Sequence, residues 1–397
     1  MEQATIFFTT TTYEGHAFRT QGVVDEGHHL QDLCVESMEH PSRVGDLYLA
    51  KVMDLVPSIH AAFVEIAPGV RAFLPDSDCT QPIHAGDEVL VQVTCDAIKT
   101  KDMRATMAFE LGASHVCLIH GSGAHGVSKK FSKQQRKDWK GFLDDYPTDS
   151  YHLLLRTRAA ACSKEDIRSE IDTLVDAYLK LLDKSTHVTC YSKLYERPRN
   201  MVDALLGYVS RYQSRVPVEQ MRVITDDSGL YKELVVTCAS MTPALTQEQI
   251  QLYTDDSYPL YKLYSLSSQM EELTKSVVWL KSGANLLLEP METLCAIDVN
   301  SGKGPRKKSP GGVLAQNKEA ALEIGRQLRL RNLSGMILID FINMETEEEK
   351  QELLSYMRRV VQADARKVVV VDITPLGLME LTRAKAHKSL KQTLKDC

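Results

Sequence analysis

Residues 291–304, METLCAIDVNSGKG, and residues 335–344, GMILIDFINM, enclose the part of the sequence that decides the fold. Each reads as a short apolar strand that carries one aspartate, Asp298 in the first and Asp340 in the second. A carboxylate at the end of a hydrophobic strand is costly to bury without a counter-charge. Two of them on strands that could lie side by side suggest a site for a hard divalent cation. Mg²⁺ fits best, because it takes few protein carboxylates and binds substrate phosphate as well.

The segment around these two strands alternates strand and helix, which predicts an α/β arrangement. The expected strands are 286–288, 294–299, 336–341 and 367–373, and the expected helices are 315–330 and 346–361. In the first helix, Lys318, Arg326 and Arg329 are predicted to point outward, where the arginines could contact phosphates. The second helix opens on three glutamates, which suit a helix N-terminus.

Before residue 286, the sequence predicts both short strands and helices, without regular alternation. Residues 1–35 read as short strands, too few to fold alone, so we expect them to pair with a later segment. Apolar spacing predicts helices at 164–183, 200–212 and 264–280, and strand character at 222–225 and 233–239.

Composition sets the broad class. The chain has 397 residues, enough for several domains, and a net charge of −6 that does not itself indicate a nucleic-acid binder. Its nine cysteines include no Cys-x-x-Cys pair. That argues against a disulfide framework and against an internal zinc site, and it favours a reducing, cytoplasmic location. We expect no signal peptide and no transmembrane segment, since no apolar run approaches about 20 residues.

Residues 42–118 contain several short strands separated by glycine and proline, which suggests a small β-barrel. The stretch GDLYLAKVMDLVPSIHAAFVEIAPGVRAFLPDSD resembles an S1-type barrel, whose sheet face binds single-stranded RNA by stacking and basic contacts. Phe63 and Phe73 are the candidate stacking residues, and Lys51, Arg71 and Lys101 are nearby cations. Burial of both phenylalanines in the barrel core is the alternative.

Residues 119–160 hold a glycine-rich turn and a basic run, GSGAHGVSKKFSKQQRKDWK. The run is either a solvated helix face or a phosphate-binding surface. Arg156 and Thr157 follow an apolar strand at 153–155. A guanidinium fork beside a hydroxyl suits a phosphate group.

Taken together, the stretches AIDVNSGKG, NKEAALEIGRQLRLRNLSGMILIDFINM and DITPLGLMELTRAK resemble the catalytic half of the ribonuclease E/G family, most of all its ribonuclease G-like members. The resemblance implies an α/β multidomain fold, α+β overall. Its implied parts are an RNase H-like subdomain (1–35 plus 205–275), an S1 RNA-binding barrel (36–118), a 5′-sensor region (119–204) and a DNase I-like catalytic subdomain (276–397).

The same resemblance implies roles for individual residues. Asp298 and Asp340 match the Mg²⁺-binding aspartates, and Asn300 matches an asparagine that assists near the scissile phosphate. The implied activity is cleavage of single-stranded RNA to 5′-phosphate and 3′-hydroxyl products, in rRNA and mRNA processing and decay. In the S1-like barrel, Phe63, Phe73 and Lys101 match residues that clamp RNA.

A second set of implied roles concerns the RNA 5′ end. Arg156 and Thr157 match a pair that grips a 5′-monophosphate, and Lys367 matches a basic residue near that pocket.

The sequence departs from the family pattern in four places. Arg158-Ala159 follow the Arg-Thr pair where Ala-Gly is usual, and a pocket glycine aligns with Ala113, next to Gly112. Asn343 replaces an aspartate, and we expect cleavage to survive this change. The family's Cys-x-x-Cys zinc link joins two subunits, whereas this chain stops at Cys397. Zn²⁺ is therefore expected only if the natural chain extends further; otherwise the expected homo-oligomer forms without zinc.

Two other functions compete with a Mg²⁺-dependent endoribonuclease. A non-catalytic RNA-binding protein of the same fold is disfavoured by the presence of Asp298, Asn300 and Asp340. A metal-dependent DNase or general phosphodiesterase is disfavoured by the S1-like barrel and the Arg-Thr pair.

Overall fold

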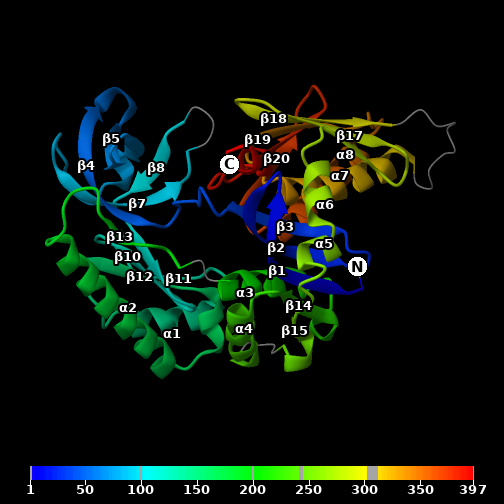
Figure 1. The fold of residues 1–397 in the computed structure, drawn as a ribbon. Coiled ribbons are helices and arrows are strands. Elements are labelled where there is room, and N and C mark those ends of the chain that lie inside the picture. Colours follow the sequence, from blue (N-terminus) through cyan, green and yellow to red (C-terminus); the bar gives the residue numbers. More distant parts are fainter. Residues whose placement is uncertain (1, 98–100, 199–200, 241–244, 302–311, 397) are drawn as a thin grey trace. The chain divides into compact units, whose positions relative to one another are not determined.

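A computed structural model of the chain describes residues 2–97, 101–198, 201–240, 245–301 and 312–396. The chain divides into two compact units, one made of residues 1–42 and 200–397 and the other of residues 43–199 (Figure 1). Each unit holds two β-sheets. Among the described helices, none is both long and apolar enough to span a membrane.

The first sheet of the discontinuous unit has the strand order β15-β14-β1-β2-β3. Its strands are β1 (Ala4–Tyr13), β2 (His16–Asp25), β3 (Leu30–Ser37), β14 (Met221–Thr225) and β15 (Ile250–Leu252). β1 pairs in parallel with β14, with Ile6 opposite Val223. The N-terminal strands therefore pair with a strand some 200 residues later in the chain. This confirms the prediction that residues 1–35, too few to fold alone, pair with a later segment.

Helices cover both faces of this sheet. One core contains α3 (Met201–Tyr212) and α4 (Ser228–Ser240), and the other contains α5 (Leu260–Leu263), α6 (Leu266–Glu272) and α9 (Leu390–Lys395). The strand predicted at 233–239 is wrong, because those residues belong to α4. Leu234 and Cys238, four residues apart, are buried in the same core, and this helical spacing overrides the local β-branched residues.

The second sheet of this unit has the order β16-β17-β18-β19-β21-β20. Its strands are β16 (Val277–Trp279), β17 (Asn285–Pro290), β18 (Leu294–Asn300), β19 (Gly335–Asp340), β20 (Val368–Ile373) and β21 (Leu378–Arg383). The helices α7 (Gly312–Leu330) and α8 (Glu347–Val360) pack together on one face, as Figure 1 shows. β18 and β19 run in parallel and are joined through α7, so the predicted strand–helix–strand unit is confirmed.

The helix predicted at 264–280 is only partly correct. α6 ends at Glu272, and Val277–Trp279 form an edge strand that pairs with β17. A turn at Gly283, with φ of +84°, connects the two strands. Glycine suits this turn because it adopts a positive φ without steric cost.

Arginines near the end of α7 connect this second sheet to β3 of the first sheet within the same unit. Arg326 donates to the carbonyl of Leu30, and Arg329 donates to the carbonyl of Gln31 at 3.3 Å. The prediction that Arg329 points outward is wrong, because its side chain is buried. These guanidinium groups serve backbone carbonyls and are not free phosphate contacts.

The other unit begins with a closed five-stranded barrel of order β4-β5-β6-β8-β7, closed by pairing of β7 with β4. Its strands are β4 (Leu47–Val56), β5 (Ala61–Ala67), β6 (Val70–Pro75), β7 (Glu88–Cys95) and β8 (Met103–Thr106), and β13 (Lys193–Tyr195) adds to β4 from outside. Small and β-branched side chains, among them Ala62, Val64, Ala72 and Val91, fill the interior.

A four-stranded sheet of order β11-β12-β10-β9 follows the barrel. Its strands are β9 (Glu110–Gly112), β10 (Val116–His120), β11 (Gly126–Val127) and β12 (Tyr151–Leu155). Two helices, α1 (Lys133–Leu143) and α2 (Lys164–Ser185), pack on it. The basic run lies at and before α1, which buries Trp139 and Phe142 and leaves its lysines exposed.

Candidate functional site

Asp298 and Asp340 lie opposite each other on adjacent parallel strands. Residues alternate across β18, so Ile297 and Val299 enter the core under α7 and α8 while Asp298 and Asn300 take the other face. Strand neighbours in a sheet are about 4.8 Å apart. The two carboxylates therefore share one row, on the sheet face opposite α7 and α8, at the carboxyl ends of β18 and β19.

Asn300 extends this row of polar groups. Its Nδ2 donates a hydrogen bond of 2.7 Å to Oδ2 of Asp298. Within the described residues, which leave out 302–311, neither aspartate forms an ion pair, and no third histidine, cysteine, aspartate or glutamate completes a metal cluster. Two neighbouring carboxylates repel each other unless a cation lies between them. Two hard oxygen ligands with room for waters and phosphate fit Mg²⁺.

Asn317 is a site residue that the sequence reasoning missed. Its side chain is fully buried in α7, and it makes two hydrogen bonds to the backbone of Ile342. Nδ2 donates to the Ile342 carbonyl at 2.7 Å, and Oδ1 accepts from the Ile342 N–H at 3.1 Å. Asn317 thereby fixes the chain two residues after Asp340. The available signal was a polar residue on the buried stripe that continues through Ala320 and Ile324.

On the barrel, Phe63 and Phe73 form a direct cross-strand pair. Their rings meet edge to face with centroids 5.9 Å apart, and both side chains are partly exposed. Burial of this pair in the core is thus excluded, because Ala62, Val64 and Ala72 occupy the interior instead.

Two cations lie near this aromatic pair. The Arg71 guanidinium stacks 5.1 Å from the centre of the Phe63 ring and pairs with Asp102 at 3.2 Å. Lys101, next to Asp102, is exposed. The surface around the phenylalanines can therefore combine base stacking with attraction for phosphate.

Arg156 follows β12, where its backbone N–H donates to the His115 carbonyl at 2.8 Å. Its guanidinium reaches Gly112 on β9, where a Cβ would come within 2.6 Å of Nη2. The glycine that makes room for the guanidinium is therefore Gly112, one residue before Ala113, with which the family's pocket glycine aligns. Thr157 is exposed, and its hydroxyl lies 2.8 Å from the hydroxyl of Ser128.

Glu170 of α2 organises the loop beneath Arg156. Its carboxylate accepts from the N–H groups of His115 and Val116 at 2.7 and 2.9 Å and contacts the His115 ring at 2.8 Å. Beside it, burial and the neighbouring Glu110 raise the pKa of the Cys117 thiol to about 12. The thiol thus stays neutral, so Arg156 is not neutralised by a thiolate there.

These features agree with comparisons to known proteins. A family model described as "Ribonuclease E/G family" matches residues 111–386, which is more than half of the chain. The chain belongs to the ribonuclease E/G family. It is 27% identical to ribonuclease G of Salmonella typhimurium over 392 residues, covering 93% of this chain and 78% of that protein. It is 28% identical to ribonuclease E of Nostoc sp. over 383 residues, covering 92% of this chain and 54% of that protein.

Membership of the ribonuclease E/G family confirms the resemblance and enzyme class inferred from the sequence motifs. Lys367 is exposed beside β20 and belongs to a different compact unit from Arg156. Asn343 is exposed in the loop after β19. Cys397, the expected zinc ligand, lies outside the described residues.

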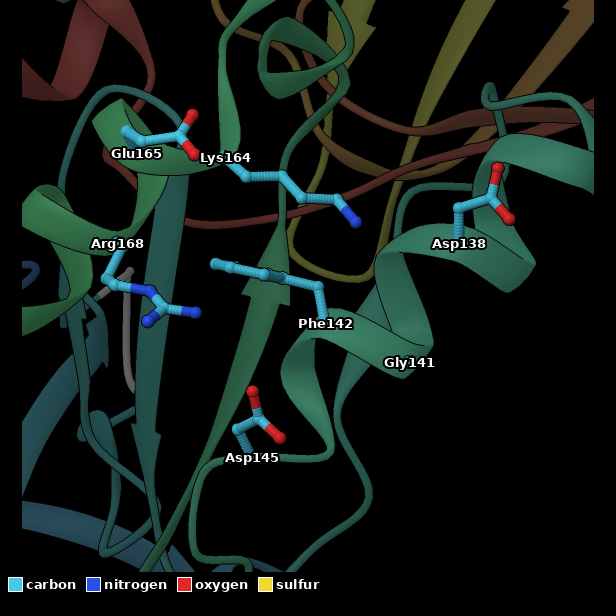
Figure 2. Close-up of a pocket in the computed structure, with 7 residues that line it drawn as sticks. All are labelled: Asp138, Gly141, Phe142, Asp145, Lys164, Glu165 and Arg168. Carbon is cyan, nitrogen blue, oxygen red and sulfur yellow. The ribbon is translucent and has the colours of Figure 1, made fainter.

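A pocket of about 470 Å³ lies between α1 and the start of α2, as Figure 2 shows. Lys164 and Arg168 lie 5.8 and 5.4 Å from the centre of the Phe142 ring. Three carboxylates also line the pocket, those of Asp138, Asp145 and Glu165. Its charges are mixed, and none of the residues predicted from the family resemblance lines it, so we assign it no role in the reaction.

Proposed function

We propose that this protein is a Mg²⁺-dependent endoribonuclease that cleaves single-stranded RNA to 5′-phosphate and 3′-hydroxyl products. The observation that carries the proposal is the register pair of Asp298 and Asp340 on the sheet face opposite α7 and α8. Family membership and the names of the relatives, ribonuclease G and ribonuclease E, support RNA as the substrate.

In the proposed site, Asp298 and Asp340 would hold the metal. The chemistry that a bound Mg²⁺ supplies is polarisation of a phosphate oxygen and acidification of a water. Asn300 holds Asp298 in one orientation through its 2.7 Å hydrogen bond. The second N–H of the same amide is available to donate to the scissile phosphate. Asn317 anchors the backbone of Ile342, two residues after Asp340, and would thereby support the position of the Asp340 carboxylate.

Substrate binding is proposed to involve the other compact unit. Phe63 and Phe73 would stack on unpaired bases of the RNA, with Lys101 near the backbone. Arg156 and Thr157 would bind a 5′-monophosphate through a planar fork and a hydroxyl. Lys367, an exposed cation of the first unit, would contact RNA phosphate by itself.

The wider biological assignment extends the family relationship. We propose a cytoplasmic homo-oligomer acting in rRNA and mRNA processing and decay. On the same basis we propose that the chain contains an S1-type barrel, a 5′-sensor region, an RNase H-like subdomain and a DNase I-like catalytic subdomain.

Cleavage of a 5′-monophosphorylated, A/U-rich single-stranded RNA tests the proposal. Mg²⁺ should support cleavage and EDTA should stop it. Asp298→Asn should lose activity by at least about 100-fold, since losing even an outer partner of a metal site costs 10–100-fold. Asp372→Asn, an exposed carboxylate on the same sheet, is the matched control and should cleave normally. RNA binding without cleavage would indicate a non-catalytic protein, and equal cleavage of single-stranded DNA would indicate a general nuclease.

A further inference from the structure

Trp279 on the edge strand β16 lies in one row with the candidate active site. It pairs with Asn285 of β17, and Asn285 pairs with Asn300 of β18. Directly paired residues place their side chains on the same face of a sheet. Trp279 therefore shares the face of Asn300 and Asp298, two strands away, at a backbone separation of about 10 Å.

Within the described residues, Trp279 contributes little to packing. Its side chain is 70% exposed, whereas the only other tryptophan, Trp139, is 7% exposed in a helix core. The neighbouring row on the same face begins at Val277, which is 43% exposed, and leads through Leu287 to Asp298. The exposed ring of Trp279 thus lies on the same sheet face as Asn300 and Asp298, in rows that run from β16 to β18.

We propose that Trp279 is a stacking platform for a base of single-stranded RNA close to the phosphate that is cleaved. This inference rests on the proposed function and adds a substrate subsite to it. Stacking on an aromatic face accepts any unpaired base but not a base inside a duplex. Trp279 would thereby make the catalytic face itself selective for single strands.

RNA fits this face better than a second protein chain. A protein surface that covered Trp279 would also lie over the row of Asn300 and the adjoining row of Asp298 and Asp340. The carboxylates would then be closed to substrate and metal. An extended RNA strand can lie across the rows with its phosphate at the carboxylates and a flanking base on the indole.

Tryptophan fluorescence tests the contact without any cleavage. In EDTA, an A/U-rich single-stranded RNA should quench the emission of wild-type protein, and a duplex of the same sequence should not. The difference between wild type and Trp279→Phe isolates the signal of Trp279, and Trp139→Phe leaves it as the sole tryptophan. Quenching of the same size in Trp279→Phe as in wild type would overturn the proposal, because Trp139 would then be its source.

Kinetics provide the second test. Trp279→Ala should raise KM for single-stranded RNA roughly 5- to 150-fold, the range for one stacked base, with kcat nearly unchanged. Trp279→Phe should largely restore KM. Val371→Ala, an exposed apolar residue on the opposite edge strand, is the matched control.

The outcomes separate this inference from the proposed function. Unchanged KM in Trp279→Ala overturns the stacking role, even if Asp298→Asn is inactive and the nuclease assignment stands. A shift of Trp279→Ala to a smaller species in gel filtration, with KM unchanged, would identify a contact between subunits and also overturns it. Normal cleavage by Asp298→Asn would instead contradict the proposed function, whatever the fluorescence shows.

Discussion

Asp298 of β18 and Asp340 of β19 are direct register partners, although 41 residues of chain separate them. The pairing follows from the parallel strand–helix–strand unit, which brings the carboxyl ends of both strands to one edge. Alternation along each strand then turns both carboxylates away from the helices. The site thus depends on strand register, and changes that loosen the flanking loops should affect it.

Asn317→Ala should lower the free energy of unfolding by about 1–3 kcal/mol, because two backbone groups of Ile342 lose their buried partner. It should also reduce kcat, since the loop after Asp340 is no longer held. Chemical denaturation and steady-state cleavage measure the two effects. The control is Gln316→Ala at the preceding, half-buried position of α7. Wild-type kcat in Asn317→Ala would show that this loop does not position the site.

Gly112→Ala should leave the fold intact but weaken the preference for a 5′-monophosphate. The added Cβ would come within 2.6 Å of Nη2 of Arg156, and the flexible guanidinium can move aside only by leaving its position. The ratio of cleavage rates on monophosphorylated and triphosphorylated RNA reports the effect. Ala113→Gly should change this ratio little. The opposite pattern, with Ala113 critical and Gly112 neutral, would contradict the assignment.

Glu170→Ala should also weaken the preference for a 5′-monophosphate, but indirectly, through the loop that positions Arg156. The loop at His115 and Val116 loses its anchor, and this loop accepts the backbone N–H of Arg156. We expect a loss of about 1.5–3 kcal/mol in stability, typical of hydrogen bonds to a charged group, and a smaller monophosphate preference. Asp172→Ala, exposed on the same helix, serves as control. A stability loss with an unchanged preference would limit Glu170 to a structural role.

Phe63→Ala and Phe73→Ala should each raise KM for single-stranded RNA roughly 5- to 150-fold if each ring stacks on a base. Neither should unfold the barrel, since both rings lie outside its interior. Binding to a short oligonucleotide in EDTA provides the measurement, with Met53→Ala as an exposed apolar control on β4. Unchanged binding in both variants would remove this face from the RNA path.

Much of the sheet that carries Asp298 and Asp340 could be predicted, because its sequence signals are local. The apolar runs before Asp298 and Asp340 and the 3.6-residue spacing of α7 appear directly in the sequence. The edge strand β16 was not predictable in this way. Met270, Leu273 and Val277 have helical spacing, and a three-residue strand is too short to interrupt it. Only pairing with β17 decides its structure, and the position of Trp279 was hidden with it.

Other parts of the site depend on contacts between distant residues. Asn317 binds a backbone group 25 residues away, and nothing near it in the sequence indicates that partner. Arg326 and Arg329 read as outward-facing cations until β3 is placed beside α7. In β5, apolar residues occupy both faces, so the pattern around Phe63 left its direction open; the closed barrel decides it.

A double-mutant cycle on Asp298 and Asp340 tests the central claim most directly. Cleavage of a 5′-monophosphorylated single-stranded RNA is measured against Mg²⁺ concentration for Asp298→Asn, Asp340→Asn and the double variant. If both carboxylates hold one ion, each single variant should lose at least about 100-fold, and the double variant should be little worse than either. A single variant that cleaves at the wild-type rate with the wild-type Mg²⁺ dependence would contradict the account.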